Sequence, residues 1–402
     1  MAATRNLQVV YPDDSEPTTS KPASCPPAFL EYIWYVSFIY GMLGQVWGIV
    51  IPLVGGAILV LLAASCFLNV GGQALRVYKP VAWAFCTGAL VIAIQLLFHQ
   101  GTQQALTEGI AFVEWLALLI IVQSLSLRPR FLQRFALVAF AIGLVTLPYV
   151  NLSSGAEGVV RAGASGTGMS NANALALWFG FCTVYFLFWG LQSQKLIARA
   201  ASWIVAVGCF YIVAITVSRG PLLAIVLACI VGFRSSLKQS FVPLLSLVLV
   251  MCLVYISGVF DEEIGYYTAR GAEESGRGKL WPLALERILD SPWTGVGMGD
   301  FRIPYGPNRY VPPHNAFLRI TLEAGIVPLI CFLGYLARVV IGALRIMQRV
   351  PVGEAALLPP LVAFALFEMM VLDMVFMSPW TVVVFSLAAG AGQADAHQRS
   401  MS

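Results

Sequence analysis

Apolar runs of about 20 residues, the length of helix that crosses the hydrocarbon core of a bilayer, recur along almost the whole chain. Hydrophobic residues make up 59% of the 402 residues and charged residues 11%. Soluble domains carry about 25% charged residues. We therefore predict an all-α polytopic membrane protein and exclude a chain of two or three soluble domains.

The apolar runs predict about 12 membrane-spanning helices. They lie at residues 29–47, 50–68, 80–98, 109–125, 131–149, 171–190, 200–217, 220–233, 241–258, 320–340, 355–373 and 379–393. Spans one to nine thus occupy residues 29–258, and spans ten to twelve occupy residues 320–393. Residues 1–28, which hold five prolines, are predicted to be a disordered tail, and residues 394–402 a short second tail. Residues 259–319 remain as one long polar loop.

Lysine and arginine are distributed unevenly between alternate loops, and this asymmetry sets the orientation of a membrane protein. If the N-terminus is cytoplasmic, 15 of the 24 basic residues lie in cytoplasmic segments and seven in the loop at 259–319. The short outer loops hold only Arg161 and Arg219. Both termini are therefore predicted to be cytoplasmic and the long loop to lie on the outer side of the membrane. The net charge of +4 reflects this topology and does not indicate a nucleic-acid partner.

The long loop is the one segment that could form a module outside the membrane, because structureless loops of such length are uncommon. Its residues 280–289 place apolar side chains at helical spacing beside charged ones. This pattern predicts a helix that lies on the membrane surface. Four prolines then stiffen residues 302–313, which lead to His314.

Arginine at the outer membrane surface costs insertion free energy unless an anion or an acidic partner faces it. Arg219 precedes Pro221, which suits the first turn of a helix that runs inward. Arg161 precedes a loop rich in Gly, Ser and Asn at 163–173, which leads into another inward helix. The N-terminus of a helix binds anions. Both arginines are therefore candidates for an anion site, and the alternative is that they contact lipid phosphates or nearby acids.

His314 stands at the outer end of span ten. Imidazole exchanges a proton near neutral pH, so His314 is a candidate general base, although a lone histidine more often serves as a cap or a hydrogen-bonding residue. The acidic runs at 261–263 and 273–274 are more typical of a solvated surface than of a cation site. No cluster of Cys and His and no Asp-x-Asp pair occurs. We expect no metal site and no cofactor.

Three acidic residues lie inside predicted spans or at their ends: Glu114, Glu368 and Asp373. Each is a candidate functional residue, because charge inside a membrane is costly, but pairing within the bundle is the favoured interpretation. The eight cysteines lie in apolar segments or in the N-terminal tail, so we expect no structural disulfide.

Several short motifs follow one another in a fixed order. They are Ser-Arg-Gly-Pro at 218–221, Arg-Gly-Lys-Leu-Trp at 277–281, Gly-Val-Gly-Met-Gly at 295–299, Pro-His-Asn-Ala-Phe-Leu at 313–318 and Glu-Ala-Gly at 323–325. Their order and spacing over roughly residues 160–345 resemble the O-antigen ligase and polymerase superfamily. The first 150 residues match it only as generic spans.

The resemblance implies a metal-independent, inverting glycosyltransferase of the bacterial inner membrane whose active site faces the periplasm. Its donor would be a glycan linked to undecaprenyl diphosphate. Arg219, Arg277 and Arg161 would bind the donor diphosphate, His314 would be the catalytic base, and Asn315 would support it.

The acceptor separates the members of the superfamily. A ligase transfers O-antigen polysaccharide to a sugar hydroxyl of the lipid A-core, as in lipopolysaccharide assembly, and a polymerase transfers it to another lipid-linked repeat. A related protein oligosaccharyltransferase transfers the glycan to a hydroxyl side chain of a protein. One dominant outer loop after span nine favours the ligase, and the polymerase is the alternative. A polytopic transporter or flippase also has many spans, but transporters place polar residues at the bilayer midplane. In this chain the candidate site residues Arg161, Arg219 and His314 are all predicted to lie at the outer membrane surface.

Overall fold

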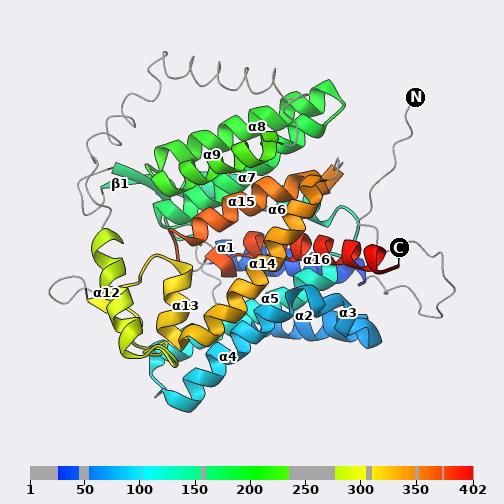
Figure 1. Cartoon of the computed structure of the whole chain (residues 1–402). Coiled ribbons are helices and arrows are strands. Elements are labelled where there is room, and N and C mark those ends of the chain that lie inside the picture. The colour runs from blue at the N-terminus through cyan, green and yellow to red at the C-terminus, as the bar shows by residue number, and fades with distance from the viewer. Residues whose placement is uncertain are drawn as a thin grey trace.

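The computed structural model describes residues 26–44, 54–99, 101–154, 160–234, 277–304, 310–348, 353–373 and 375–401. It is mostly helical, as the apolar runs predict (Figure 1). The main helices are α1 (Ala28–Leu43), α2 (Val54–Val70), α4 (Ala82–Phe98), α5 (Gln103–Leu125), α6 (Phe131–Thr146), α7 (Ala172–Gln192), α8 (Leu196–Ile215), α9 (Arg219–Arg234), α14 (Ile326–Gln348), α15 (Leu358–Met369) and α16 (Pro379–Met401). Shorter elements are α3 (Ala74–Tyr78), α12 (Arg277–Asp290), α13 (Ala316–Ala324) and two hairpins, β1 (Val150–Ser154) with β2 (Val160–Ala164) and β3 (Ile303–Pro304) with β4 (Tyr310–Val311).

Six helical stretches in the described part of the chain are long and apolar enough to cross a membrane. They are Val54–Phe98, Gln103–Leu125, Phe131–Tyr149, Ala172–Gln192, Leu196–Ile215 and Ile326–Gln348. The first of them joins α2, α3 and α4, where the sequence predicts two spans separated by Arg76 and Lys79. Predicted span nine, at 241–258, lies outside the described residues. A multi-pass membrane protein is supported, and the count of twelve spans stays a prediction.

The helix α7 lies at the centre of the bundle. It packs against α6, α8, α9 and α15, and most of its side chains are buried. Gly180 of α7 lets the ring of Phe364 on α15 approach the helix closely. A Cβ atom on Gly180 would lie 2.7 Å from that ring. Lipid tails are as apolar as the protein core, so close van der Waals packing of this kind holds membrane helices together.

A buried carboxylate ties α1 to the segment between α5 and α6. Glu31 is only 2% exposed, and its oxygens lie 2.7 Å from Nε of both Arg128 and Arg134. The hydroxyl of Tyr35 donates a third contact at 2.6 Å. Because a buried charge is stable only when it is paired, this cluster fixes one end of α1 against α6.

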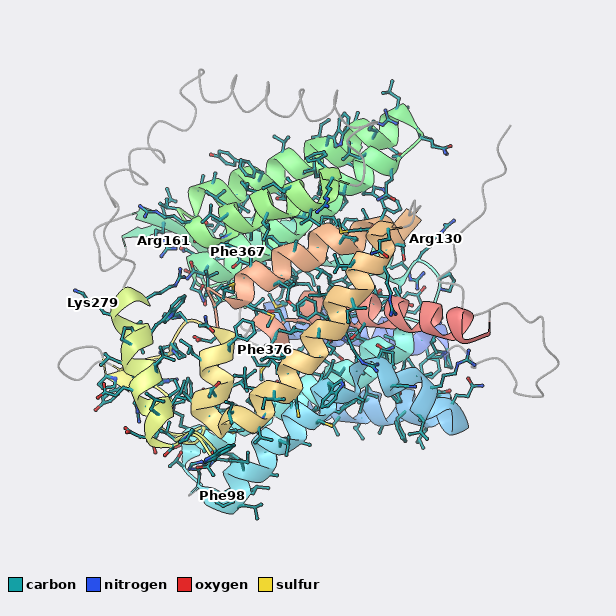
Figure 2. The ribbon with its side chains drawn as sticks, in the orientation of Figure 1. Phe98, Arg130, Arg161, Lys279, Phe367 and Phe376 are labelled. Atoms are coloured by element: carbon teal, nitrogen blue, oxygen red, sulfur yellow. The ribbon has the colours of Figure 1, made fainter. Side chains whose placement is uncertain are left out.

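Segments that the charge distribution places outside the membrane gather at one end of the bundle. There α12 runs across the direction of the long helices, close to α13, and Arg130 and the C-terminus lie at the other end (Figures 1 and 2). Leu280 and Ala284 of α12 pack against Phe301 and Leu322. The helix predicted in the long loop is therefore present. Its contact with a membrane surface and the orientation of the bundle stay predictions.

Candidate functional site

The short turn that follows α15, residues 370–373, brings together segments that are far apart in the sequence. Asn315 Nδ2 donates a hydrogen bond of 3.3 Å to the carbonyl oxygen of Met370. Arg277 Nη2 donates one of 3.0 Å to the carbonyl oxygen of Val371. The starts of α12 and α13 are thus fixed to the same turn.

Asp373 in this turn holds the candidate base. Its Oδ2 lies 3.3 Å from His314 Nδ1, and its Oδ1 accepts a hydrogen bond of 2.9 Å from the backbone N–H of Asn315. Asp373 is 7% exposed, whereas the side chain of His314 is 39% exposed. A carboxylate at Nδ1 favours the tautomer that carries its proton there, which leaves Nε2 as an acceptor. Nε2 of the imidazole can therefore accept a proton from a bound substrate on the exposed side of the ring.

The backbone around His314 is held from both sides. His314 itself has φ of 52°, in the left-handed region that few non-glycine residues adopt. Before it, the carbonyl oxygen of Pro313 accepts a hydrogen bond of 3.1 Å from Trp281 Nε1. After it, Asn315 Oδ1 accepts from the N–H groups of Phe317 and Leu318, at 2.9 and 3.1 Å, and so caps α13. The predicted supporting residue Asn315 therefore joins the turn to the helix.

A buried ion cluster anchors α13 to α5. Arg319 Nη2 pairs with Glu108, and Arg319 Nε lies 2.8 Å from Glu323 Oε1. The guanidinium also lies 4.7 Å from the ring centre of Phe301. Glu323 is fully buried on α13, and its pairing with Arg319 offsets the cost of burying its carboxyl group. The sequence counted Arg319 only as a loop cation, and no spacing indicated that it is buried.

Arg219 and Arg277 occupy equivalent positions, as the first residues of α9 and α12. Arg219 is exposed. A Cβ atom on the next residue, Gly220, would lie 3.1 Å from Val371, so the start of α9 also meets the turn. Glu368 is fully buried one turn earlier on α15, and neither of its carboxylate oxygens has a hydrogen-bond partner among the described residues. Among the described residues, the positive charge of Arg277 acts on the Glu368 carboxyl group, but no hydrogen bond joins the two side chains.

Arg161 lies on β2 at the same end of the molecule (Figure 2). Its Nε donates a hydrogen bond of 3.1 Å to the carbonyl oxygen of Thr216, and its Nη2 donates to Ser218 Oγ at 2.8 Å and to Asn173 Oδ1 at 3.1 Å. Ser218 directly precedes Arg219. The structure thus connects these two arginines through the chain between α8 and α9.

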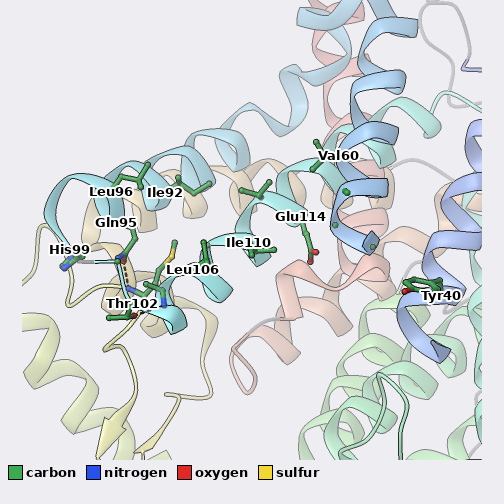
Figure 3. Close-up of a pocket in the computed structure, with 18 residues that line it drawn as sticks. Tyr40, Val60, Ile92, Gln95, Leu96, His99, Thr102, Leu106, Ile110 and Glu114 are labelled. Atoms are coloured by element: carbon green, nitrogen blue, oxygen red, sulfur yellow. Dashed lines mark hydrogen bonds between the residues drawn. The ribbon is translucent and has the colours of Figure 1, made fainter. Parts of the chain in front are cut away.

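An apolar groove of about 690 Å³ lies between α2, α4 and α5, beside the end of α1 (Figure 3). The loop that carries the Gly-Val-Gly-Met-Gly motif closes one end of it: Met298 lines the groove, and its N–H donates to Gln95 Oε1 at 2.8 Å. Tyr40 lies at the other end. Glu114 contributes a carboxyl group to the wall. The sequence did not indicate which spans form such a groove.

Potential metal ligands are not clustered among the described residues: no group of three or more His, Cys, Asp or Glu could hold an ion there. The acidic runs at 261–263 and 273–274 lie outside these residues. The described cysteines that remain as thiols are Cys66, Cys86, Cys182, Cys209, Cys229 and Cys331.

Comparison with protein families matches residues 203–333, about a third of the chain, to the O-antigen ligase family. The matched segment contains Arg219, Arg277 and His314, and Asp373 lies beyond it. No curated protein matches the chain. The chain is thus a multi-pass membrane protein whose residues 203–333 are similar to the O-antigen ligase family, which confirms the resemblance carried by its motifs.

Proposed function

We propose that this protein is a metal-independent, inverting O-antigen ligase. It transfers O-antigen polysaccharide from undecaprenyl diphosphate to a sugar hydroxyl of the lipid A-core, at the periplasmic face of the inner membrane. The observation that carries the proposal is the contact between His314 and Asp373 at the turn that also binds Arg277 and adjoins the start of α9. The family match supports transfer of a glycan.

In this mechanism His314 Nε2 removes the proton from the acceptor hydroxyl as its oxygen attacks the anomeric carbon. Asp373 stabilises the imidazolium that forms, since its carboxylate faces Nδ1. The bond between the anomeric carbon and the diphosphate oxygen breaks on the opposite side, so the configuration at that carbon is inverted. Its electron pair leaves with the diphosphate.

Two arginines would stabilise the departing diphosphate. Arg219 and Arg277 each begin a helix, so the guanidinium charge and the positive end of the helix dipole act in the same place. Oriented donors that meet charge in the transition state are worth about 3 kcal/mol each in comparable sites. This arrangement supplies the charge that a metal ion supplies in other transferases.

The groove between α2, α4 and α5 suits the polyprenyl chain of the donor. Its wall is mostly apolar, and exposed side chains such as Leu96 and Leu106 open it toward lipid. Gly109 is one of the small residues of the wall. The 294–299 loop closes one end of the groove and also packs against the end of α13, the helix that follows His314. A chain lying there would reach the region of the site.

Transfer should be measured with the purified protein, lipid-linked O-antigen and lipid A-core in detergent containing EDTA. We expect the polysaccharide to appear on the lipid A-core. Elongation of the lipid-linked donor alone would instead identify a polymerase. An absence of transfer to either acceptor would favour the transporter or flippase, and activity that returns only with Mg²⁺ or Mn²⁺ would contradict metal independence.

Replacing His314 with Asn should lower kcat roughly 10² to 10⁴-fold, because the general base is lost. Asn is chosen because it tolerates the left-handed backbone of position 314. Asp373→Asn should also lower kcat, since the imidazolium loses its counter-charge, while the donor KM changes little in both variants. Asp290→Asn, an exposed carboxylate on α12, is the control. Near-normal turnover of the folded His314→Asn variant would show that His314 is not the general base.

Arg219→Lys keeps the charge and removes the planar fork that can bind two diphosphate oxygens. We expect the rate at saturating donor to fall about a hundredfold, which corresponds to up to about 3 kcal/mol of transition-state stabilisation. Arg338→Lys, near the opposite end of the bundle, is the matched control; its guanidinium donates to the carbonyl oxygen of Lys79. Equal rates for the two variants would show that Arg219 does not bind the diphosphate and only contacts lipid head groups.

Gly109→Leu should narrow the groove, because a side chain at this position would project toward Met298, whose sulfur lies 3.8 Å from the site of the new Cβ. We expect a several-fold higher donor KM for the full polyprenyl chain and little change for a donor with a truncated chain. Gly208→Leu on α8, where no atom of the other described residues lies within 4 Å of the new Cβ, controls for added bulk on an exposed helix face. An unchanged KM in Gly109→Leu would place the chain elsewhere.

A further inference from the structure

The turn between α8 and α9 has a backbone conformation that its sequence does not favour. Val217 has φ of 51°, in the left-handed region. A β-branched residue is a rare outlier there, because its side chain clashes with the backbone. Such a conformation persists only where the surrounding contacts hold it, and these strained positions gather at functional sites. The contacts on either side of Val217 therefore hold this turn in place.

Arg161 binds the chain on both sides of Val217. Its Nε donates to the carbonyl oxygen of Thr216 at 3.1 Å, and its Nη2 donates to Ser218 Oγ at 2.8 Å. Thr216 and Ser218 are both buried, so water cannot replace these bonds easily. The guanidinium thus spans the strained residue.

Asn173 completes the contact from a third element. Its Oδ1 accepts from Arg161 Nη2 at 3.1 Å and from Ser218 Oγ at 3.0 Å. Asn173 lies in the first turn of α7, whose cap Asn171 accepts from the N–H of Ala174 at 2.8 Å. The four residues Arg161, Asn173, Thr216 and Ser218 therefore form a clamp that joins β2, α7 and the α8–α9 turn.

We propose that Arg161 is a positioning residue, which holds the α8–α9 turn and thereby directs Arg219 at the donor diphosphate without binding the diphosphate itself. The role of Arg219 in this proposal rests on the proposed function. The planar guanidinium is suited to the task, because its N–H groups point in fixed directions and bind the three acceptors at fixed angles, which an ammonium group cannot do. The family resemblance instead implied direct contact between Arg161 and the diphosphate.

The positioning role and the direct diphosphate-binding role of Arg161 predict different effects of replacing Ser218. If Arg161 acts through the clamp, then Ser218→Ala, which removes one of its acceptors, should resemble Arg161→Gln. We expect kcat to fall by up to about a hundredfold in Arg161→Gln, because small misplacements of a catalytic group have effects of that size. The donor KM should change less than about twofold, since the proposal leaves diphosphate contact to other groups.

A double-mutant cycle makes the comparison quantitative. In Arg161→Gln with Ser218→Ala, the loss of kcat should be no larger than in Arg161→Gln alone, because both changes open the same clamp. Arg161→Lys should not restore the rate. A raised donor KM in Arg161→Gln, together with a normal Ser218→Ala variant, would show direct diphosphate binding and overturn the proposal. Arg338→Gln is the control.

Hydrogen–deuterium exchange tests the clamp independently of the activity. In detergent, amides of residues 214–222 should exchange faster in Arg161→Gln and in Ser218→Ala than in the unchanged protein, and those in α14 should not change. Unchanged exchange at 214–222 in both variants would overturn the proposal, and Ser218→Ala still decides if Arg161→Gln does not fold. If the unchanged protein shows no glycan transfer, the proposed function fails, and this exchange result still decides whether the clamp exists.

Discussion

The carboxylate of Asp373 connects the end of α15 to the start of α13. One of its oxygens faces the imidazole of His314, and the other accepts the N–H of Asn315, so a single side chain fixes both the ring and the backbone that carries it. The neighbouring carbonyl groups of the same turn bind Arg277 and Asn315. The turn at 370–373, through this carboxylate and its carbonyl groups, is therefore the common support of the segments that form the candidate site.

Burying a charge costs free energy, and ion pairs offset this cost near both ends of the bundle. Glu31 is shared by two arginines between α1 and α6, and Arg319 is shared by two carboxylates between α5 and α13. Removing one partner of a buried pair typically costs 3 to 5 kcal/mol, because a charge is left without compensation. Such clusters therefore fix which helices are neighbours, in a medium where apolar contacts alone discriminate weakly.

Much of the helical fold could be predicted from the sequence, because the length of an apolar run sets whether a helix can cross the membrane. The motifs also placed His314 and Arg277 in one site. They did not indicate the partner of His314: Asp373 lies 59 positions further along the chain, and periodicity carries no information on which helices become neighbours. Arg161 was understood as a cation facing outward for the same reason, since its acceptors come from α7 and the α8–α9 turn.

Two glycines join the 293–299 loop to the end of α13 without any side chain between them. Gly295 has φ of 65°, and a Cβ atom there would lie 2.4 Å from the carbonyl oxygen of Leu322; on Gly325, with φ of 83°, it would lie 2.2 Å from that of Trp293. Backbone packed against backbone leaves no rotamer that could loosen the joint. The 293–299 loop and α13 are therefore joined backbone to backbone. Under the proposed function, a polyprenyl chain in the groove would contact this loop at Met298, and the same loop is fixed to the helix that follows His314.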